Sequence, residues 1–138
     1  MSSPFVLDQQ LESDTHHVTD LSLSRLLLMN DSQYPWLILV PRVADIHEVF
    51  ELTQAQQHEL WSEVARVSKL LKADFQPEKI NIGALGNIVR QLHIHIVARN
   101  TDDAAWPGPV WGAAPAVAYE QTRAQSLVDS IRSQLAAI

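Results

Sequence analysis

Two histidines in alternating positions are the residues of this 138-residue chain best suited to chemistry. They lie in residues 91–96 (QLHIHI), where polar and apolar residues alternate. That period is typical of a β-strand, in which side chains two positions apart share a face and lie roughly 6.5 to 7 Å from each other. The pattern therefore predicts a polar row of Gln91, His93 and His95, with the apolar residues between them facing the core.

A row of this kind suits phosphoryl chemistry. Imidazole is largely neutral near pH 7 and nucleophilic, so His93 can attack phosphorus and form a covalent intermediate, which replaces one hard displacement with two easier ones. His95, on the same face, can donate a hydrogen bond to a phosphate oxygen or to the leaving group. Backbone amides at Gly86 and Asn87 can contact phosphate, as glycine-containing turns often do.

Two other interpretations of the histidine pair stay open at this point. Histidine is often partly exposed, so the pair could be ordinary surface residues of an edge strand. Two histidines so spaced on a strand can also hold zinc or iron. However, Arg99 places a cation four residues after His95, and the other histidines have no ligand spacing to the pair. We therefore expect neither a metal nor a cofactor.

The elements that must position these residues follow from the apolar pattern. Strands are predicted at residues 21–30, 36–40, 79–85 and 91–99. A short helix is predicted near residues 7–11, and a terminal helix at about residues 118–137. Thr53 and Gln56 fit a capping box, so a long helix should run from there to near Asp74. The order of strands, helix, strands and helix indicates an α+β domain with a mostly antiparallel sheet.

Composition excludes several classes of protein. Apolar residues make up 46% of the chain and charged residues 19%, which is enough apolar material for a folded core. The absence of cysteine excludes disulfides, and the formal net charge of -6 argues against a nucleic-acid partner. No apolar run approaches the roughly 20 residues that span a bilayer, and the start lacks the pattern of a signal peptide. We therefore expect a cytoplasmic protein without a membrane partner.

Residues 91–97 (QLHIHIV) resemble the signature of the histidine-triad (HIT) family, His-φ-His-φ-His-φ-φ, where φ is apolar. Upstream, residues 86–89 (GNIV) resemble the family's Gly-Gln-x-Val approach to that motif, and residues 35–42 (PWLILVPR) resemble an earlier strand that ends in proline and a basic residue. The resemblance covers roughly residues 23–112.

The resemblance implies a fold and an activity. The fold is α+β and HIT-like: a mostly antiparallel five-stranded sheet with one long helix and a C-terminal helix, in a single domain over residues 1–138 whose core is about 21–112. The implied activity is that of a nucleotide phosphohydrolase or nucleotidyl transferase with a covalent nucleotidyl-histidine intermediate. Its substrate would be a dinucleoside polyphosphate or a nucleoside phosphoramidate. Most members of the family are homodimers.

The resemblance also assigns catalytic roles. The middle histidine of the motif is the family's nucleophile, and by position it is His93. The third, which contacts phosphate, is His95. Gln91 replaces the first histidine, and glutamine can form hydrogen bonds but cannot carry a proton. This difference motivates a second hypothesis, a nucleotide-binding regulatory module with little or no turnover.

Binding roles follow in the same way. Asn87 matches a polar phosphate contact of the family, and Asn81 lies near another polar position. Asn30, or Asp31 beside it, resembles the family's ribose-binding residue, although Asn30 could equally be a turn-forming asparagine. Trp106 resembles the tryptophan of a family segment near the partner subunit's active site, and a rigid surface loop is the alternative. By strand parity alone, Arg99 shares the face of His93 and is predicted to contact phosphate.

Overall fold

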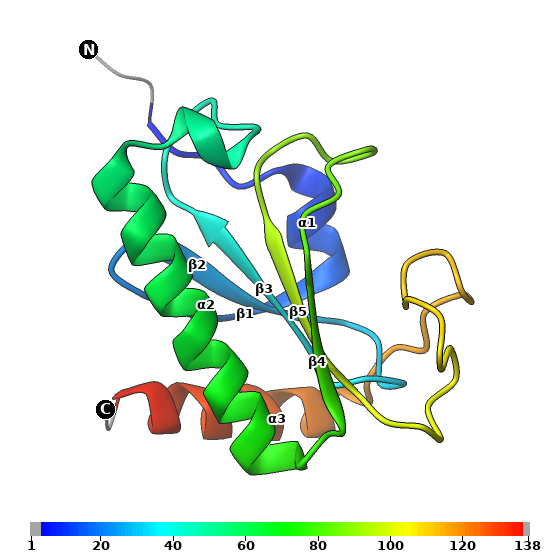
Figure 1. The fold of residues 1–138 in the computed structure, drawn as a ribbon. Helices are drawn as coiled ribbons and strands as arrows, with labels where there is room; N and C mark the ends of the chain where they lie inside the picture. The colour runs from blue at the N-terminus through cyan, green and yellow to red at the C-terminus, as the bar shows by residue number, and fades with distance from the viewer. Residues whose placement is uncertain (1–3, 137–138) are drawn as a thin grey trace.

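The computed structural model describes residues 4–136, which form a five-stranded antiparallel sheet with helices (Figure 1). The order across the sheet is β1-β2-β3-β5-β4, and all neighbouring strands are antiparallel. The strands are β1 (Thr15–Asp20), β2 (Ser24–Met29), β3 (Trp36–Pro41), β4 (Lys79–Gly83) and β5 (Ile94–Arg99). The helices are α1 (Gln9–Asp14), α2 (Gln54–Phe75), α3 (Gln121–Ala136) and the 3-10 turn η1 (Val49–Glu51). The predicted α+β class is confirmed.

Helix α2 begins and ends as its sequence dictates. The Thr53 side chain accepts the Gln56 N–H, and the Gln56 side chain accepts the Thr53 N–H, so the predicted capping box is present. The helix ends at Phe75, one residue after the predicted end, and Gln76 follows in the left-handed conformation. Its buried positions include those predicted to form the apolar face: Leu60, Val64, Val67 and Leu71.

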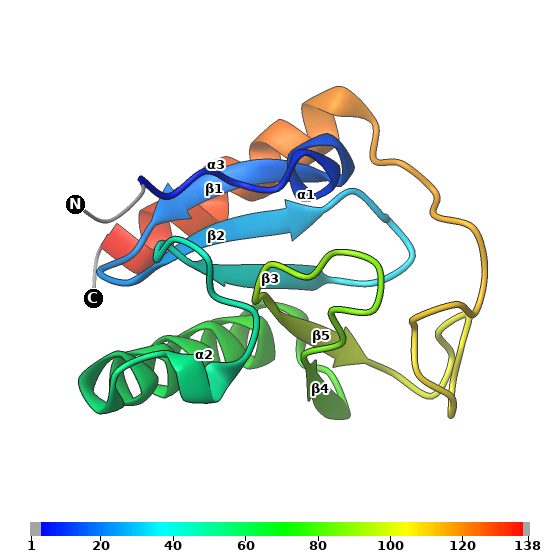
Figure 2. The same cartoon turned by 90° about the horizontal axis from the view of Figure 1, so that it is seen from above.

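The two faces of the sheet are covered by different parts of the chain. Helices α2 and α3 cover one face, where α2 packs on β5 and β3 and α3 packs on β1 (Figures 1 and 2). Leu11 of α1 and Val110 of the long loop after β5 pack on the opposite face. In β5, Ile94 and Ile96 point to the helix-covered face, so His95 between them points toward α1 and the loop. The core arrangement thus decides which face carries the chemistry.

Several predicted element boundaries differ from those in the structure, and contacts with other segments explain two of them. Strand β5 begins at Ile94, because its ladder with β3 begins there and its ladder with β4 begins at His95. Before it, Leu92 N donates to Ile46 O instead. Helix α3 begins at Gln121, because residues 117–119 are tied to the β2–β3 turn. Tyr119 N, for example, donates to Asn30 Oδ1 at 3.0 Å. The last residue of the predicted helix, 137, lies outside the described residues.

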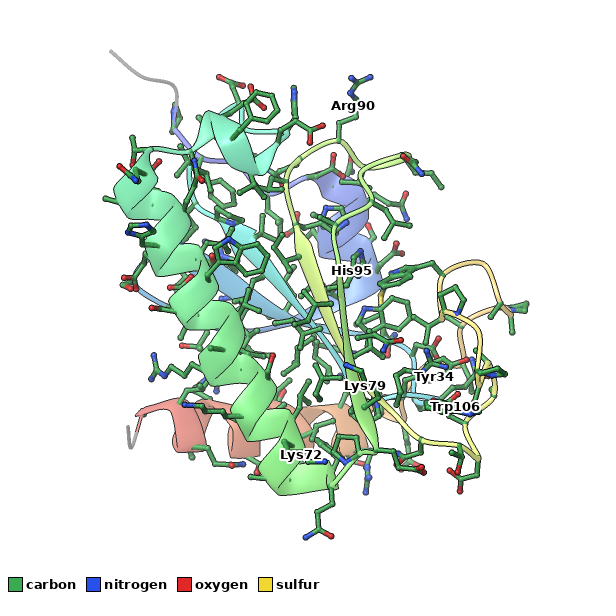
Figure 3. All side chains as sticks on the ribbon, in the orientation of Figure 1. Tyr34, Lys72, Lys79, Arg90, His95 and Trp106 are labelled. Carbon is green, nitrogen blue, oxygen red and sulfur yellow. The ribbon has the colours of Figure 1, made fainter. Side chains whose placement is uncertain are left out.

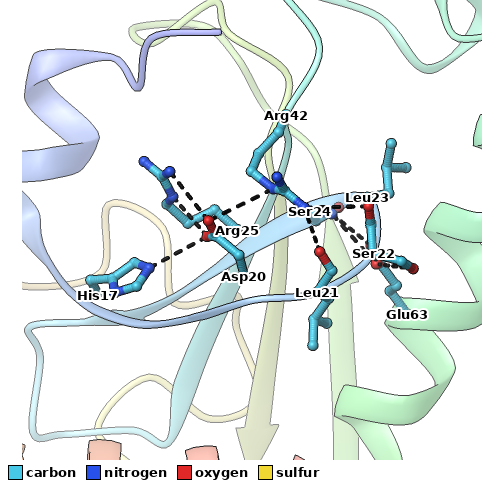
Figure 4. A network of polar contacts seen from close by, with 9 residues as sticks. All are labelled: His17, Asp20, Leu21, Ser22, Leu23, Ser24, Arg25, Arg42 and Glu63. Atoms are coloured by element: carbon cyan, nitrogen blue, oxygen red, sulfur yellow. Dashed lines mark hydrogen bonds and ion pairs between the residues drawn. The ribbon is translucent and has the colours of Figure 1, made fainter.

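Strand β1 was not predicted from the sequence. Its residues THHVTD are mostly polar, and only Val18 is buried, because the strand lies at an edge of the sheet. Glu63 of α2 holds the neighbouring turn (Figure 4). Its side chain is buried, and the residue is only 2% exposed. Its carboxylate accepts Leu23 N–H at 2.9 Å and Ser24 N–H at 3.1 Å. A buried carboxylate satisfied in this way ties the long helix to the start of β2.

Within residues 4–136, no helix combines the length and the apolar character needed to cross a membrane.

Candidate active site

His95 lies on β5, between β3 and the edge strand β4 (Figure 3). A tryptophan holds its side chain. Trp36 Nε1 donates to His95 Nδ1 at 3.0 Å. An indole N–H can only donate, so Nδ1 must accept, and the proton of the neutral ring lies on Nε2. Burial, aided by the charge of nearby His93, lowers the pKa of His95 to about 3. His95 is therefore a neutral hydrogen-bond donor near pH 7.

His93 has the opposite tautomer. Its Nδ1 lies 2.7 Å from the carbonyl oxygen of Gln91. A carbonyl can only accept, so Nδ1 carries a proton. In the neutral ring, Nε2 on the far side therefore keeps its lone pair. The rings of His93 and His95 are 4.8 Å apart between centroids, with an angle of 67° between their planes. The site thus places an imidazole lone pair beside an imidazole N–H donor.

Both histidines line a cavity of about 700 Å³, within the range of small-molecule sites. Much of its wall is apolar, and it is formed by α1, the end of β2, Trp36, the turn at residues 85–89 and the loop at residues 110–116. Gly86 and Asn87 line the same cavity as the two histidines. Gly86 has a φ of 72°, which favours glycine.

Asn30 and Asp31 were both considered for a ribose contact, and only Asp31 lines the cavity. Asp31 is 4% exposed, and its Oδ1 accepts Gln33 N–H at 3.1 Å. No described residue donates to Oδ2. Asn30 is not part of the cavity wall, and its side chain accepts Tyr119 N–H instead. A carboxylate in this position can accept hydrogen bonds from hydroxyl groups of a ligand.

Comparison with known proteins identifies the family of the chain. The model of the HIT domain matches residues 10–102. The chain belongs to the HIT family. A histidine triad protein from Bradyrhizobium japonicum has a similar structure, with 45% identity, coverage of 95% of this chain and 98% of that chain, and a TM-score of 0.92. A histidine triad (HIT) protein from Sinorhizobium meliloti 1021 is 49% identical, and the match covers 94% of this chain and 96% of that chain with a TM-score of 0.91.

A third histidine triad protein, from Marinobacter aquaeolei VT8, is 42% identical, with coverage of 95% and 96% and a TM-score of 0.92. No curated protein matches the chain. The family assignment and the HIT-like fold expected from residues 91–97 are therefore confirmed. Membership of the HIT family supports nucleotide binding or hydrolase-type chemistry in general.

The side chain of Gln91 in this HIT protein does not join the two histidines. Its Oε1 accepts Asp8 N–H at 2.8 Å, and its Nε2 donates to Val6 O at 2.9 Å. Gln91 lines a separate, smaller pocket and precedes β5, so the predicted three-residue polar row is wrong. Only its backbone carbonyl reaches His93. The strand pattern misled the prediction because the regular ladder had not yet begun at residue 91.

Arg99 shares the sheet face of His95, as parity predicted, but its guanidinium is held by four hydrogen bonds within the protein. It is 1% exposed, donates to both carboxylate oxygens of Asp103 at 2.7 and 3.0 Å, and donates to Asn81 Oδ1 at 2.8 Å and Gly108 O at 2.8 Å. The hydrogen bond from Arg99 lowers the pKa of Asp103 to about 2. Neither Arg99 nor Asn81 lines the cavity, which corrects the expectation of a phosphate contact for Arg99.

Trp106 belongs to the Arg99 cluster. The Arg99 guanidinium lies 5.7 Å from the Trp106 ring and 5.8 Å from the Tyr34 ring. Trp106 is absent from the cavity wall, which contains Trp111 instead. The Trp111 ring lies 5.4 Å from that of His95. Trp111 was not predicted from the sequence as a site residue. The only sequence signal for Trp111 is its place in a loop rich in proline and tryptophan.

Proposed function

We propose that this HIT protein is a nucleotide phosphohydrolase or nucleotidyl transferase in which His93 Nε2 attacks the α-phosphorus of its substrate. The observation that carries the proposal is the 2.7 Å contact between His93 Nδ1 and the Gln91 carbonyl, because it leaves the Nε2 lone pair free at the cavity. The substrate class is a dinucleoside polyphosphate or a nucleoside phosphoramidate.

The reaction has two displacements. In the first, a bond forms between His93 Nε2 and phosphorus, while the bond from phosphorus to the polyphosphate oxygen or to the amine nitrogen breaks. The leaving group departs with the bonding electrons and takes a proton from water. In the second, water or another acceptor attacks phosphorus, the bond to Nε2 breaks, and the acceptor's proton passes to solvent. The ring returns to its starting tautomer.

The remaining contacts of the cavity suit different parts of a nucleotide. His95 Nε2–H, with the backbone and side chain around Gly86 and Asn87, would stabilise charge on the phosphate oxygens. The Asp31 carboxylate would accept hydrogen bonds from the ribose hydroxyls. Leu11 and Met29, in the same cavity wall, offer an apolar surface for the base.

The test compares His93→Asn with His58→Asn on the exposed side of α2. Asparagine at position 93 can still donate to the Gln91 carbonyl but lacks the nucleophilic nitrogen. With a labelled nucleoside phosphoramidate, we expect turnover to fall at least about 10³-fold in His93→Asn, as for loss of a nucleophile in other enzymes, and to persist in His58→Asn. Rapid quenching should show a nucleotidyl group on the peptide that contains His93. Unchanged turnover in His93→Asn refutes the proposal.

A nucleotide-binding regulatory module is the second candidate, and the contacts of Gln91 favour it. The Gln91 side chain is bound to the N-terminal segment and has no titratable proton, so Gln91 supplies no proton to a leaving group. Nucleotide binding by calorimetry, without product or covalent adduct, would support this function over catalysis. A large gain in rate in Gln91→His would show instead that glutamine weakens an existing activity.

Three broader expectations are also proposals. A single domain and a cytoplasmic location follow from the sequence analysis, and the homodimer follows from the family resemblance. Within residues 4–136, strand β4 pairs only with β5. Its other edge is therefore free to pair with a second copy of the chain. Sedimentation equilibrium over a range of protein concentrations tests the dimer.

A further inference from the structure

We propose that Trp36 is a positioning residue whose indole N–H selects the tautomer of His95 that can donate to the reacting phosphate. The inference rests on the proposed function, in which His95 contacts the phosphate while His93 attacks it. Trp36 is the first residue of β3, and His95 lies on the neighbouring strand β5. The donor and acceptor, Trp36 Nε1 and His95 Nδ1, are 3.0 Å apart.

The selection follows from the number of donors and acceptors at this contact. A neutral imidazole can carry its proton on either nitrogen, and only the form with the proton on Nε2 has an acceptor at Nδ1. In the other form, two N–H groups would face each other in a buried place, and a lone pair on Nε2 would face the phosphate oxygens. Trp36 thereby disfavours the form that repels the phosphate.

The surroundings make Trp36 the only described partner for this nitrogen. Trp36 and His95 are both 5% exposed, and the rings of Trp36 and Trp111 lie 5.7 Å and 5.4 Å from the ring of His95. These aromatic rings limit access of water to Nδ1, so solvent cannot readily replace the indole N–H. Trp36 Nε1 in turn has no other acceptor in residues 4–136.

A packing role alone would not need the N–H group. The Trp36 ring also packs edge-on against Tyr34, at 6.2 Å between centroids, and against Trp111 at 6.4 Å. A phenylalanine ring could retain much of this apolar packing. The N–H directed at His95 Nδ1 is therefore the part of Trp36 whose effect can be tested separately.

The experiment uses the full chain with ¹⁵N-labelled histidine and compares wild type, Trp36→Phe and Tyr34→Phe. Tyr34→Phe is the control because Tyr34 packs on Trp36 but does not line the cavity. In the NMR spectrum at pH 7, wild type and the control should show a pyridine-type Nδ1 and a pyrrole-type Nε2 at His95. Trp36→Phe should show a mixture of the two tautomers. A wild-type spectrum with the proton on Nδ1 overturns the inference, even if Trp36→Phe does not fold.

Kinetics separate the inference from the proposed function. With a nucleoside phosphoramidate, Trp36→Phe should lower kcat about 10- to 100-fold, below the roughly 10²- to 10³-fold loss of an oxyanion donor, because part of the population keeps the right tautomer. KM should change less than about 3-fold, because His95 acts mainly on charge that develops during the reaction. Unchanged kcat and tautomer in Trp36→Phe, with His93→Asn inactive, overturn the inference alone. Activity in His93→Asn overturns the proposed function, while the tautomer measurement still reports on Trp36.

Discussion

His95 should make the stability of the folded protein depend on pH, and the effect should begin above the range in which ordinary carboxylates titrate. Burial, with the charge of His93, lowers its pKa from 6.5 to about 3. Below pH 6.5 the unfolded chain binds a proton at this histidine, whereas the folded protein does not until about pH 3. The contribution to stability is therefore fully present above pH 6.5 and is lost as the pH falls toward 3.

The size of the effect follows from proton linkage. Each pH unit well inside the window changes the free energy of unfolding by about 1.4 kcal/mol, so moving from pH 7 to pH 5 should cost about 2 kcal/mol. The carboxylate of Asp103 contributes little over this interval, because both its ordinary pKa of 3.8 and its lowered pKa of about 2 lie below pH 5. The loss between pH 7 and pH 5 therefore reports on histidine.

Urea unfolding at the two pH values, in wild type and His95→Asn, is the assay. Asparagine does not titrate, and its Oδ1 can still accept the Trp36 N–H that His95 Nδ1 accepts at 3.0 Å. The histidines outside the site contribute equally to both proteins, so wild type should lose about 2 kcal/mol more than His95→Asn on going from pH 7 to pH 5. Equal losses in the two proteins would show that His95 is not held neutral by its surroundings.

Two further predictions concern the loop that reaches the cavity. Arg99→Met should destabilise the protein by about 3–5 kcal/mol in urea unfolding, because it leaves the Asp103 carboxylate, whose side chain is only 8% exposed, without its charged partner. The double variant Arg99→Met with Asp103→Leu should lose less stability than Arg99→Met alone. A raised KM with unchanged stability in Arg99→Met would instead favour a phosphate contact. Gly83→Ala places a Cβ 2.9 Å from the Trp111 ring and should cost about 1–3 kcal/mol of unfolding free energy. The cost should shrink in a Trp111→Leu background, and an equal cost there would contradict the steric explanation.

Several elements could be predicted because their signals are local. The capping box at Thr53 and the spacing of apolar residues along α2 depend on a few neighbouring positions, and the structure confirms both. Strand β1 was missed because an edge strand exposes most of its side chains and lacks apolar alternation.

The candidate site could be predicted only in part. The HxH spacing located His93 and His95, and both line the cavity with Gly86 and Asn87. Parity placed Arg99 on the correct face but could not show that Asp103, Asn81 and Gly108 occupy its donors. Charge and spacing describe what a side chain can bind, whereas burial and neighbours decide what it does bind.

The sequence by itself determined the family, the order of most elements and the two histidines, because these follow from residue types at short, regular spacing. The tertiary structure decided the chemical state of each ring. Trp36, 59 residues from His95 in the chain, sets the tautomer of that ring. The N-terminal segment, more than 80 residues away, binds the side chain of Gln91. Tautomers and engaged side chains depend on which donor meets which acceptor in the packed interior, and contacts between distant segments leave no periodic pattern in the sequence.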